Sequence, residues 1–321
     1  MRLNTLGRTS IEVSEFIFGA GTVGGIGGNP ALRGKGISPE QGLMRFDEAW
    51  ARGITVIDTA DVYGGGESEL AVGQWLESRR PRGILVQTKT GAVSYERHPF
   101  FDLSRGHISR QLRQSVGRLG RVDLYLSHGP DPDTPLEETL EAFAEAQESG
   151  MIRAFGMCNV DAALLERVLA VAASRGLPRP EWIQNALNLL ERGDERELIP
   201  LVAAEGIGYT PYSPLAGGLL TERYLDGASA EPGSRIAVAG SYFYTGVYTE
   251  ENLAKVSRLR TLAREREVSV AALALAWLRA HPTVTAPLVA PSRPEHWSAV
   301  DEALRIDLDQ QEFATIAGIF A

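Results

Sequence analysis

The stretch VDLYLSHGPDPDTPLEETLEAFAEAQESGMIRAFGM at residues 122–157 contains one complete strand–helix–strand unit. Val122–Leu126 and Ile152–Met157 are short apolar runs of the kind that predicts buried strands. Between them, Leu136, Leu140 and Phe143 recur at helical spacing and predict one apolar helix face. Because parallel strands need a long crossover connection, this unit predicts two parallel strands joined by a helix.

The same alternation extends along the chain. Eight segments have the composition of buried strands: Phe16–Ala20, Ile54–Ile57, Gly83–Thr88, Val122–Leu126, Ile152–Met157, Trp182–Gln184, Gly208–Thr210 and Ala286–Ala290. Three capping boxes mark helix starts, at Ser38-Pro39-Glu40-Gln41, Thr134-Pro135-Leu136-Glu137 and Ser292-Arg293-Pro294-Glu295. Since no polar linker separates these units, we predict an α/β fold, a single-domain (β/α)8 TIM barrel spanning residues 1–321.

Three segments interrupt the regular alternation. They are the stretch before the first strand and two glycine-containing loops, Gly21–Gly36 and Asp226–Thr249. Long loops in a compact domain are usually functional, and in a barrel such loops overhang one mouth. We therefore expect the active site at that mouth.

Composition narrows the classes of function. The chain has 321 residues, 44% of them hydrophobic and 23% charged, which is typical of a globular protein. Its formal charge of −9 disfavours nucleic acid and anionic membranes, because both bind basic surfaces. No apolar run reaches the length of a spanning helix, and the first residues lack the apolar stretch of a signal peptide. We expect a cytoplasmic protein whose partner is a small molecule, with association between copies of the chain left open.

Cysteine and histidine usage argues against a metal site. Cys158 is the only cysteine, so the sequence holds neither an intrachain disulfide nor a cysteine cluster for zinc. The five histidines form no His-x-His or His-Glu-x-x-His pair. We therefore expect no bound metal.

Four ionisable residues fall at or just after predicted strand ends. Asp58, Lys89 and His128 end the second, third and fourth strands, and Tyr63 lies in the loop after Asp58. Each alone has an ordinary alternative as a helix cap, a surface charge, a core histidine or a rim tyrosine. All four, however, belong to consecutive loops that point toward the same mouth, which is where barrel enzymes place their chemistry.

Together, these four side chains have the properties of a general acid–base group. A phenol is a weak acid at neutral pH, and an adjacent ammonium such as Lys89 favours its ionised form and lowers its pKa. A buried ammonium needs a counter-ion, which Asp58 can supply. His128 can then hydrogen-bond a substrate oxygen or relay its proton.

Three segments carry a family resemblance: Ile57-Asp58-Thr59-Ala60-Asp61-Val62-Tyr63-Gly64, Thr88-Lys89 and Leu126-Ser127-His128. They resemble the catalytic tetrad segments of the aldo-keto reductase family, over nearly the whole chain. The resemblance implies NADPH-dependent reduction of aldehydes or ketones. It also implies that Tyr63 is the general acid, that Lys89 and Asp58 tune it, and that His128 orients the carbonyl.

Further segments resemble the family's nicotinamide cofactor site. Cys158, Asn159 and Gln184 match positions that hold the carboxamide, and Tyr212 matches the aromatic residue that stacks on the nicotinamide ring. The small residues after Tyr212 let backbone amides approach the diphosphate. The residues of this loop that the resemblance implies in cofactor binding are Ser213, Pro214, Leu215 and Gly217.

Ser292 and Arg293 resemble the family's clamp for the 2′-phosphate, and a helix N-terminus with a guanidinium is a good anion site. The implied cofactor is therefore NADP(H). Arg223 and Arg235 add positive charge near the diphosphate or are ordinary solvated arginines. Three departures weaken the likeness of the cofactor site: Cys158 in place of Ser, Leu187 in place of a common Tyr, and Ala290-Pro291 in place of a glycine-led turn.

The substrate side is less specific. Loop residues expected at an apolar substrate pocket are Thr22, Val23, Pro130, Tyr242, Phe243 and Tyr244, although the aromatic ones are equally suited to packing the loop onto the barrel. The stretches 127–135 and 216–221 look similar to the branch with aflatoxin-aldehyde reductases and related bacterial enzymes. That likeness implies reactive aldehydes or dicarbonyls.

Three other interpretations of the sequence compete with this one. Gly19-Ala20-Gly21-Thr22-Val23-Gly24 satisfies the G-x-G-x-x-G pattern, but no helix opens directly after it, and Asp58 lies beyond the usual spacing of about 20 residues. A metal-dependent barrel hydrolase conflicts with the histidine pattern. A regulatory NADP(H) sensor of the potassium-channel β-subunit type stays open as the alternative to an enzyme.

Overall fold

The fold is a closed ring of eight parallel strands in a computed structural model that describes residues 1–94, 100–225, 233–244 and 246–321. The eight strands are β3 (Ile17–Gly19), β4 (Val56–Asp58), β5 (Leu85–Thr90), β8 (Leu124–Ser127), β9 (Ala154–Cys158), β10 (Trp182–Gln184), β11 (Gly208–Tyr209) and β12 (Leu288–Val289). From β3 to β11 each strand pairs with the next in this order, and β12 pairs with β3. Backbone hydrogen bonds from Thr285 N to Tyr209 O and from Leu288 N to Pro211 O, both 2.8 Å, join the last two strands and close the barrel.

The predicted (β/α)8 barrel is confirmed, because all eight expected strands are present. Their bounds differ by up to two residues, and the third extends beyond the expected end. Lys89 consequently lies within β5 rather than after it.

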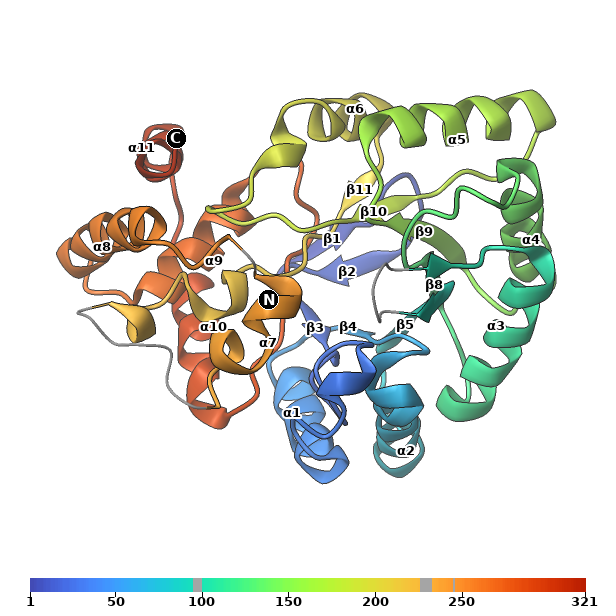
Figure 1. The fold of residues 1–321 in the computed structure, drawn as a ribbon, viewed down its shortest axis with the longest axis horizontal. Coiled ribbons are helices and arrows are strands. Elements are labelled where there is room, and N and C mark those ends of the chain that lie inside the picture. The colour runs from blue at the N-terminus through green and yellow to red at the C-terminus, as the bar shows by residue number, and fades with distance from the viewer. Residues whose placement is uncertain (95–99, 226–232, 245) are drawn as a thin grey trace.

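Helices surround the ring of strands (Figure 1). They are α1 (Pro39–Ala51), α2 (Glu67–Arg79), α3 (Arg105–Leu119), α4 (Leu136–Glu148), α5 (Ala162–Arg175), α6 (Leu198–Glu205), α7 (Arg235–Phe243), α8 (Glu250–Glu265), α9 (Val270–Ala280), α10 (Trp297–Ala303) and α11 (Gln310–Ile319). Within the described residues, none of them combines the length and apolar character that crossing a bilayer requires.

One of the three expected capping boxes is confirmed. Ser38 caps α1 and makes both reciprocal hydrogen bonds with Gln41. The box at Thr134 is wrong, because Pro135 occupies the cap position and the Thr134 N–H donates to the Asp131 carboxylate instead.

The box at Ser292 is also wrong. Arg293 occupies the N-cap position of the short 3-10 helix Pro294–His296 without a side-chain capping hydrogen bond, and α10 follows that helix directly. The Ser292 hydroxyl instead lies 3.4 Å from His296 Nδ1.

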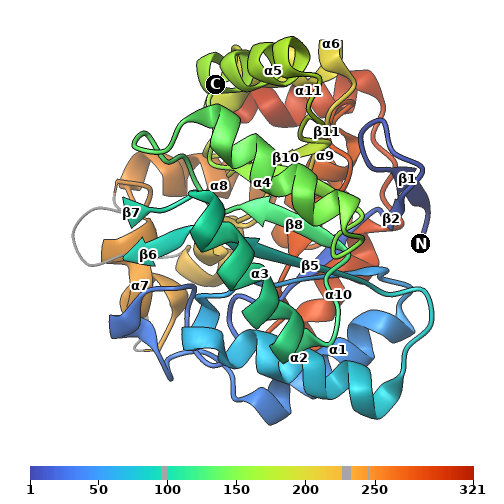
Figure 2. The same ribbon diagram turned by 90° about the vertical axis from the view of Figure 1, so that its right-hand side faces the viewer.

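The stretch before the first barrel strand forms an antiparallel hairpin of β1 (Leu3–Thr5) and β2 (Glu12–Ser14). Its side chains Leu6, Ile11 and Val13 pack in the same core cluster as the interior residues of the barrel. Figure 2 shows this hairpin at one end of the barrel, with β6 (Ala92–Ser94), β7 (Phe100–Phe101) and α7 at the opposite end. The hairpin therefore closes the end away from the predicted mouth.

The two expected loops differ from each other. Gly21–Gly36 is irregular apart from the 3-10 helix Pro30–Leu32. Asp226–Thr249 was predicted to be a loop, but it contains the helix α7. Ser234 is the N-cap of this helix, and its side chain accepts a hydrogen bond from Ala237 N. Residues 226–232 and 245 of this segment lie outside the described residues.

Candidate active site

The four strand-end residues meet at one edge of the barrel. Asp58 is the last residue of β4, Tyr63 opens the 3-10 helix Tyr63–Gly66 that follows, and His128 comes directly after β8. The strand register pairs Asp58 with Gln87, two residues before Lys89, and pairs Lys89 with Leu126, two residues before His128. The fold thus gathers these residues beside one mouth.

Lys89 is the centre of a buried hydrogen-bond chain. Its Nζ donates to Asp58 Oδ2 at 2.7 Å, to Thr59 O at 2.9 Å and to Tyr63 Oη at 3.2 Å. Burial opposes the charged form of Lys89, but the negative charge of Asp58 and the neighbouring Tyr63 outweigh it, so its pKa is raised above the ordinary value. Lys89 is therefore a fixed ammonium at neutral pH.

The phenol of Tyr63 has a higher pKa than the sequence predicts. Burial raises the pKa most, and the adjacent Lys89 ammonium lowers it by less, so the net shift is upward. The expectation of a lowered pKa considered only the nearby ammonium and omitted the cost of burying a phenolate. Tyr63 accordingly holds its proton firmly at neutral pH.

His128 lies against Tyr63. The two rings meet edge to face with centroids 5.5 Å apart. Burial, and secondly the Lys89 charge, hold the pKa of His128 well below its ordinary value. At neutral pH the side chain is an uncharged imidazole, which can donate one hydrogen bond without adding charge.

The residues expected at the carboxamide lie beside this group. Asn159 donates from Nδ2 to His128 O at 2.8 Å and accepts from the Tyr212 hydroxyl at 2.7 Å. The buried thiol of Cys158 donates to Gln184 Oε1 at 3.6 Å, and burial raises the pKa of that thiol, so it is neutral. Asn159, Tyr212, Cys158 and Gln184 therefore form one connected rim next to the tetrad.

The loop after Tyr212 has an unusual backbone. Ser213, Ala216 and Gly217 all have positive φ, at 54°, 46° and 67°. Asn188 Nδ2 donates to Ser213 O at 3.0 Å and anchors the loop from below. Pro214 and Leu215 are partly exposed beside it. Successive amide groups in a backbone of this form can bind an anion such as a diphosphate. The residues of this loop therefore fit the diphosphate of a dinucleotide.

The expected 2′-phosphate end is rich in cations. Ser292 is partly exposed and Arg293 is exposed. Burial first, and then the charges of Arg293, Arg223 and Arg45, lower the pKa of His296, while Glu295 opposes them. The three arginines are thus close enough to His296 for their charges to act on it. Arg45 and His296 had not been predicted, because neither lies in a recognisable motif.

Arg235 lies in α7, where its guanidinium sits 5.9 Å from the centroid of the Phe243 ring. Tyr244 follows α7 and packs its ring against Gly217, so this segment contacts the loop expected to bind the cofactor.

The predicted substrate-pocket residues differ in their exposure to solvent. Thr22 is partly exposed, and Pro130 is exposed beside the mouth. Tyr242 and Phe243 are 51% and 40% exposed on α7. Val23 is fully buried in the core beside α1, so its position does not support the prediction that it lines a pocket.

A residue that had not been predicted for the substrate side is Phe101 on β7. Its ring packs directly against Gly129, next to His128, and leaves no room for a Cβ there. The sequence does not indicate this contact, because it depends on the pairing of β7 with β6, which places Phe101 over the residues that follow β8.

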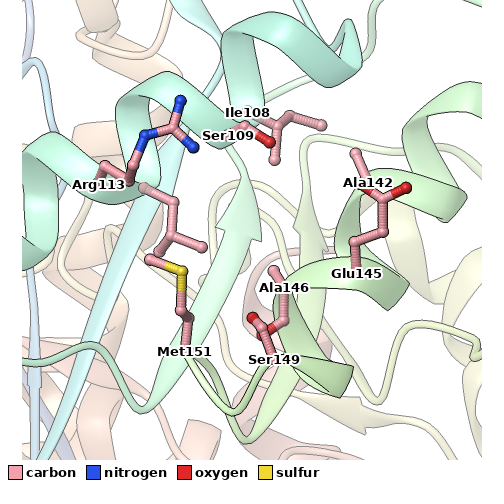
Figure 3. Close-up of a pocket in the computed structure, with 9 residues that line it drawn as sticks. Ile108, Ser109, Arg113, Ala142, Glu145, Ala146, Ser149 and Met151 are labelled. Atoms are coloured by element: carbon pink, nitrogen blue, oxygen red, sulfur yellow. The ribbon is translucent and has the colours of Figure 1, made fainter.

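The groove drawn in Figure 3 lies elsewhere. It is lined by residues of α3, α4 and the turn after α4, among them Arg113, Glu145 and Met151. These helices lie outside the ring of strands, so this groove is separate from the candidate active site.

The fold and the site define a (β/α)8 barrel with a group of ionisable side chains at one mouth and a loop of positive φ beside it. A profile of the Aldo/keto reductase family matches residues 16–321. The chain is 31% identical over 332 residues to the NADH-specific methylglyoxal reductase of Escherichia coli, covering 97% of this chain and 96% of that protein. It is 29% identical over 303 residues to the versiconal hemiacetal acetate reductase of Aspergillus parasiticus, covering 88% and 87%.

A third relative is a Schizosaccharomyces pombe protein named for a voltage-gated potassium channel subunit beta, 30% identical over 303 residues that cover 90% of this chain and 84% of that protein. The chain belongs to the Aldo/keto reductase family. It is an enzyme of the nicotinamide-dependent oxidoreductase class. Because these relatives differ in function, they select no particular branch of the family.

Proposed function

We propose that this protein reduces aldehydes or ketones to alcohols with NADPH, and that Tyr63 donates the proton. The observation that carries the proposal is the position of Lys89 Nζ, within hydrogen-bond distance of both Asp58 Oδ2 and Tyr63 Oη. This arrangement places a fixed positive charge beside the phenol, where it stabilises the phenolate that forms as the proton leaves.

A bound nicotinamide would supply the hydride for the reduction. Asn159, Gln184 and Cys158 are proposed to hold its carboxamide, and Tyr212 its ring. The diphosphate is assigned to Ser213, Pro214, Leu215 and Gly217 together with Arg223 and Arg235. The match between a positive-φ backbone and an anionic group supports this assignment.

Four side chains of the protein have separate roles in protonating the carbonyl oxygen. Neutral His128 orients the carbonyl oxygen by donating one hydrogen bond. Tyr63 gives its proton to the same oxygen, and Lys89 compensates the charge left on the phenol. Asp58 keeps Lys89 charged and in place. Thr22, Pro130, Tyr242 and Phe243 are proposed to surround the rest of the substrate, with Phe101 covering Gly129.

The pH profile follows from the three shifts. Tyr63 has a raised pKa and stays protonated, Lys89 has a raised pKa and stays charged, and His128 has a strongly lowered pKa and stays neutral. None of them changes state between about pH 6 and pH 9, so kcat for reduction should be constant over that range. Steady-state rates in a constant-ionic-strength buffer series measure this. A decline through neutral pH that disappears in His128→Asn would contradict it.

NADP is favoured over NAD by the cations near Ser292. Arg293→Ala should raise the KM for NADPH about tenfold and change the KM for NADH little, because only NADPH carries the 2′-phosphate. Initial rates with both cofactors measure the two constants. Arg305→Ala, which removes an exposed arginine beyond the other end of α10, is the matched control. Equal increases for both cofactors would refute this assignment.

A regulatory sensor is the second candidate, supported by the relative named for a potassium channel subunit. The two proposals differ in turnover. A sensor binds NADPH tightly and consumes little of it with any carbonyl, whereas an enzyme consumes it continuously. We also propose that residues 1–321 act as one domain, since the N-terminal hairpin shares the core of the barrel.

A further inference from the structure

Gln87 lies inside the barrel directly beneath the candidate tetrad. It precedes Lys89 by two residues on β5, so both side chains point to the same face of the strand. Only 1% of Gln87 is exposed. Its Nε2 donates to Asp58 Oδ1 at 2.6 Å, and the two residues are register partners on β4 and β5.

The two oxygens of Asp58 therefore have different partners. Oδ2 accepts from Lys89, while Oδ1 accepts from Gln87 and, at 3.4 Å, from Gln184. A buried carboxylate with only one oxygen engaged would be free to rotate and would leave a charged acceptor unsatisfied. The Gln87 amide fixes the plane of the carboxylate so that Oδ2 faces Lys89.

A second observation concerns the other end of the same amide. Gln87 Oε1 is buried and, in the part of the chain that the structure describes, has no hydrogen-bond partner. A buried carbonyl oxygen without a partner is unfavourable for stability. The position of the Gln87 amide thus gives Nε2 its hydrogen bond to Asp58, although it leaves Oε1 without a partner among the described residues.

We infer that Gln87 is a positioning residue for proton transfer, which acts by holding Asp58 so that Asp58 holds Lys89 against Tyr63. The inference rests on the proposed function and extends it to a residue that contacts neither the substrate nor the phenol. Gln87, a polar residue of β5 inside the barrel, thereby belongs to the same acid–base group as Asp58, Lys89 and Tyr63.

The charges around Tyr63 give the direction of the expected effect. The phenol is faced by Lys89 from β5, Asp58 from β4, His128 after β8, Cys158 from β9 and Tyr212 after β11. Lys89 lowers the pKa of Tyr63, and the negative charge of Asp58 raises it. The donor group of Gln87 partly offsets that negative charge, so losing it should raise the pKa of Tyr63 further.

The test compares Gln87→Met and Gln87→Glu with Thr88→Val. Methionine keeps the length of glutamine and removes the donor. Thr88 is the next residue on β5 and faces the other way, where its hydroxyl donates to Glu69 Oε1 at 2.6 Å. Thr88→Val therefore removes a buried hydrogen bond of the same strand without touching the tetrad.

We expect Gln87→Met to lower kcat for reduction about tenfold with an unchanged KM for NADPH. In alcohol oxidation Tyr63 accepts the proton, so the rate rises with pH, and Gln87→Met should move that rise to higher pH. Gln87→Glu should regain activity as the pH falls, because the protonated acid restores a donor to Asp58. Thr88→Val should keep the native kcat and pH profile.

Wild-type kcat and pH dependence in Gln87→Met would overturn the inference, as would an equal loss of kcat in Thr88→Val. Melting temperatures of all variants identify any that are simply unfolded, and Gln87→Glu at low pH then provides the decisive comparison. If Tyr63→Phe is inactive but Gln87→Met is native-like, only the inference fails. If Tyr63→Phe is fully active, the proposed function itself fails.

Discussion

Replacing Tyr63 with phenylalanine should lower kcat for carbonyl reduction about 10³-fold, while the dissociation constant for NADPH stays close to that of the native protein. The ring stays in place against His128, but the hydroxyl that Lys89 contacts is removed. The loss should therefore appear in the chemical step and not in cofactor binding. Carbonyl-dependent loss of NADPH absorbance and quenching of NADPH fluorescence measure the two quantities separately.

Tyr125→Phe is a matched control for this variant. Tyr125 is a buried tyrosine of β8 whose ring packs on Phe143, with centroids 5.6 Å apart, in the layer between barrel and helices. Its hydroxyl is away from the tetrad, so kcat should not change. A Tyr63→Phe protein with native kcat would show that another group donates the proton.

Lys89→Met has the second largest expected effect, because it removes two functions together. Without the ammonium, the phenolate of Tyr63 loses its stabilising charge, and kcat should fall about 10²-fold. The Asp58 carboxylate is then left buried without a counter-ion, which should destabilise the fold by about 3–5 kcal/mol. Denaturant unfolding and reduction rates measure both effects.

The double variant Asp58→Asn with Lys89→Met separates the two functions. It removes the uncompensated charge, so much of the lost stability should return. Activity should not return, since the positive charge beside Tyr63 is still missing. Recovered activity in the double variant would mean that Lys89→Met acts only through stability.

The strands were predictable because burial on both faces makes them continuous apolar runs, as in Val122–Leu126. The exact residues at which the strands end were harder to predict. Lys89 was expected after its strand but lies within β5, because pairing with β8 extends the ladder to Thr90. Helix α7 was missed, since its signal is a single Ser234 cap inside a segment with many glycines and aromatic residues.

The site was predictable to the extent that chemistry follows strand ends. Asp58, Lys89 and His128 stand at such positions in the sequence, and Tyr63 follows in a loop. The pKa of Tyr63 was not predictable, because the sequence reveals its charged neighbour but not how deeply the phenol is buried. Gln87 was missed for a related reason. Only the register of β4 against β5 gives this polar strand residue a partner.

Consumption of reduced cofactor across a panel of aldehydes, ketones and dicarbonyls, with NADPH and NADH compared under the same conditions, tests the central claim most directly. The account predicts continuous oxidation of NADPH that depends on the carbonyl, with one alcohol formed for each NADPH consumed and slower oxidation of NADH. Tight binding of NADPH without turnover on any member of the panel would contradict it.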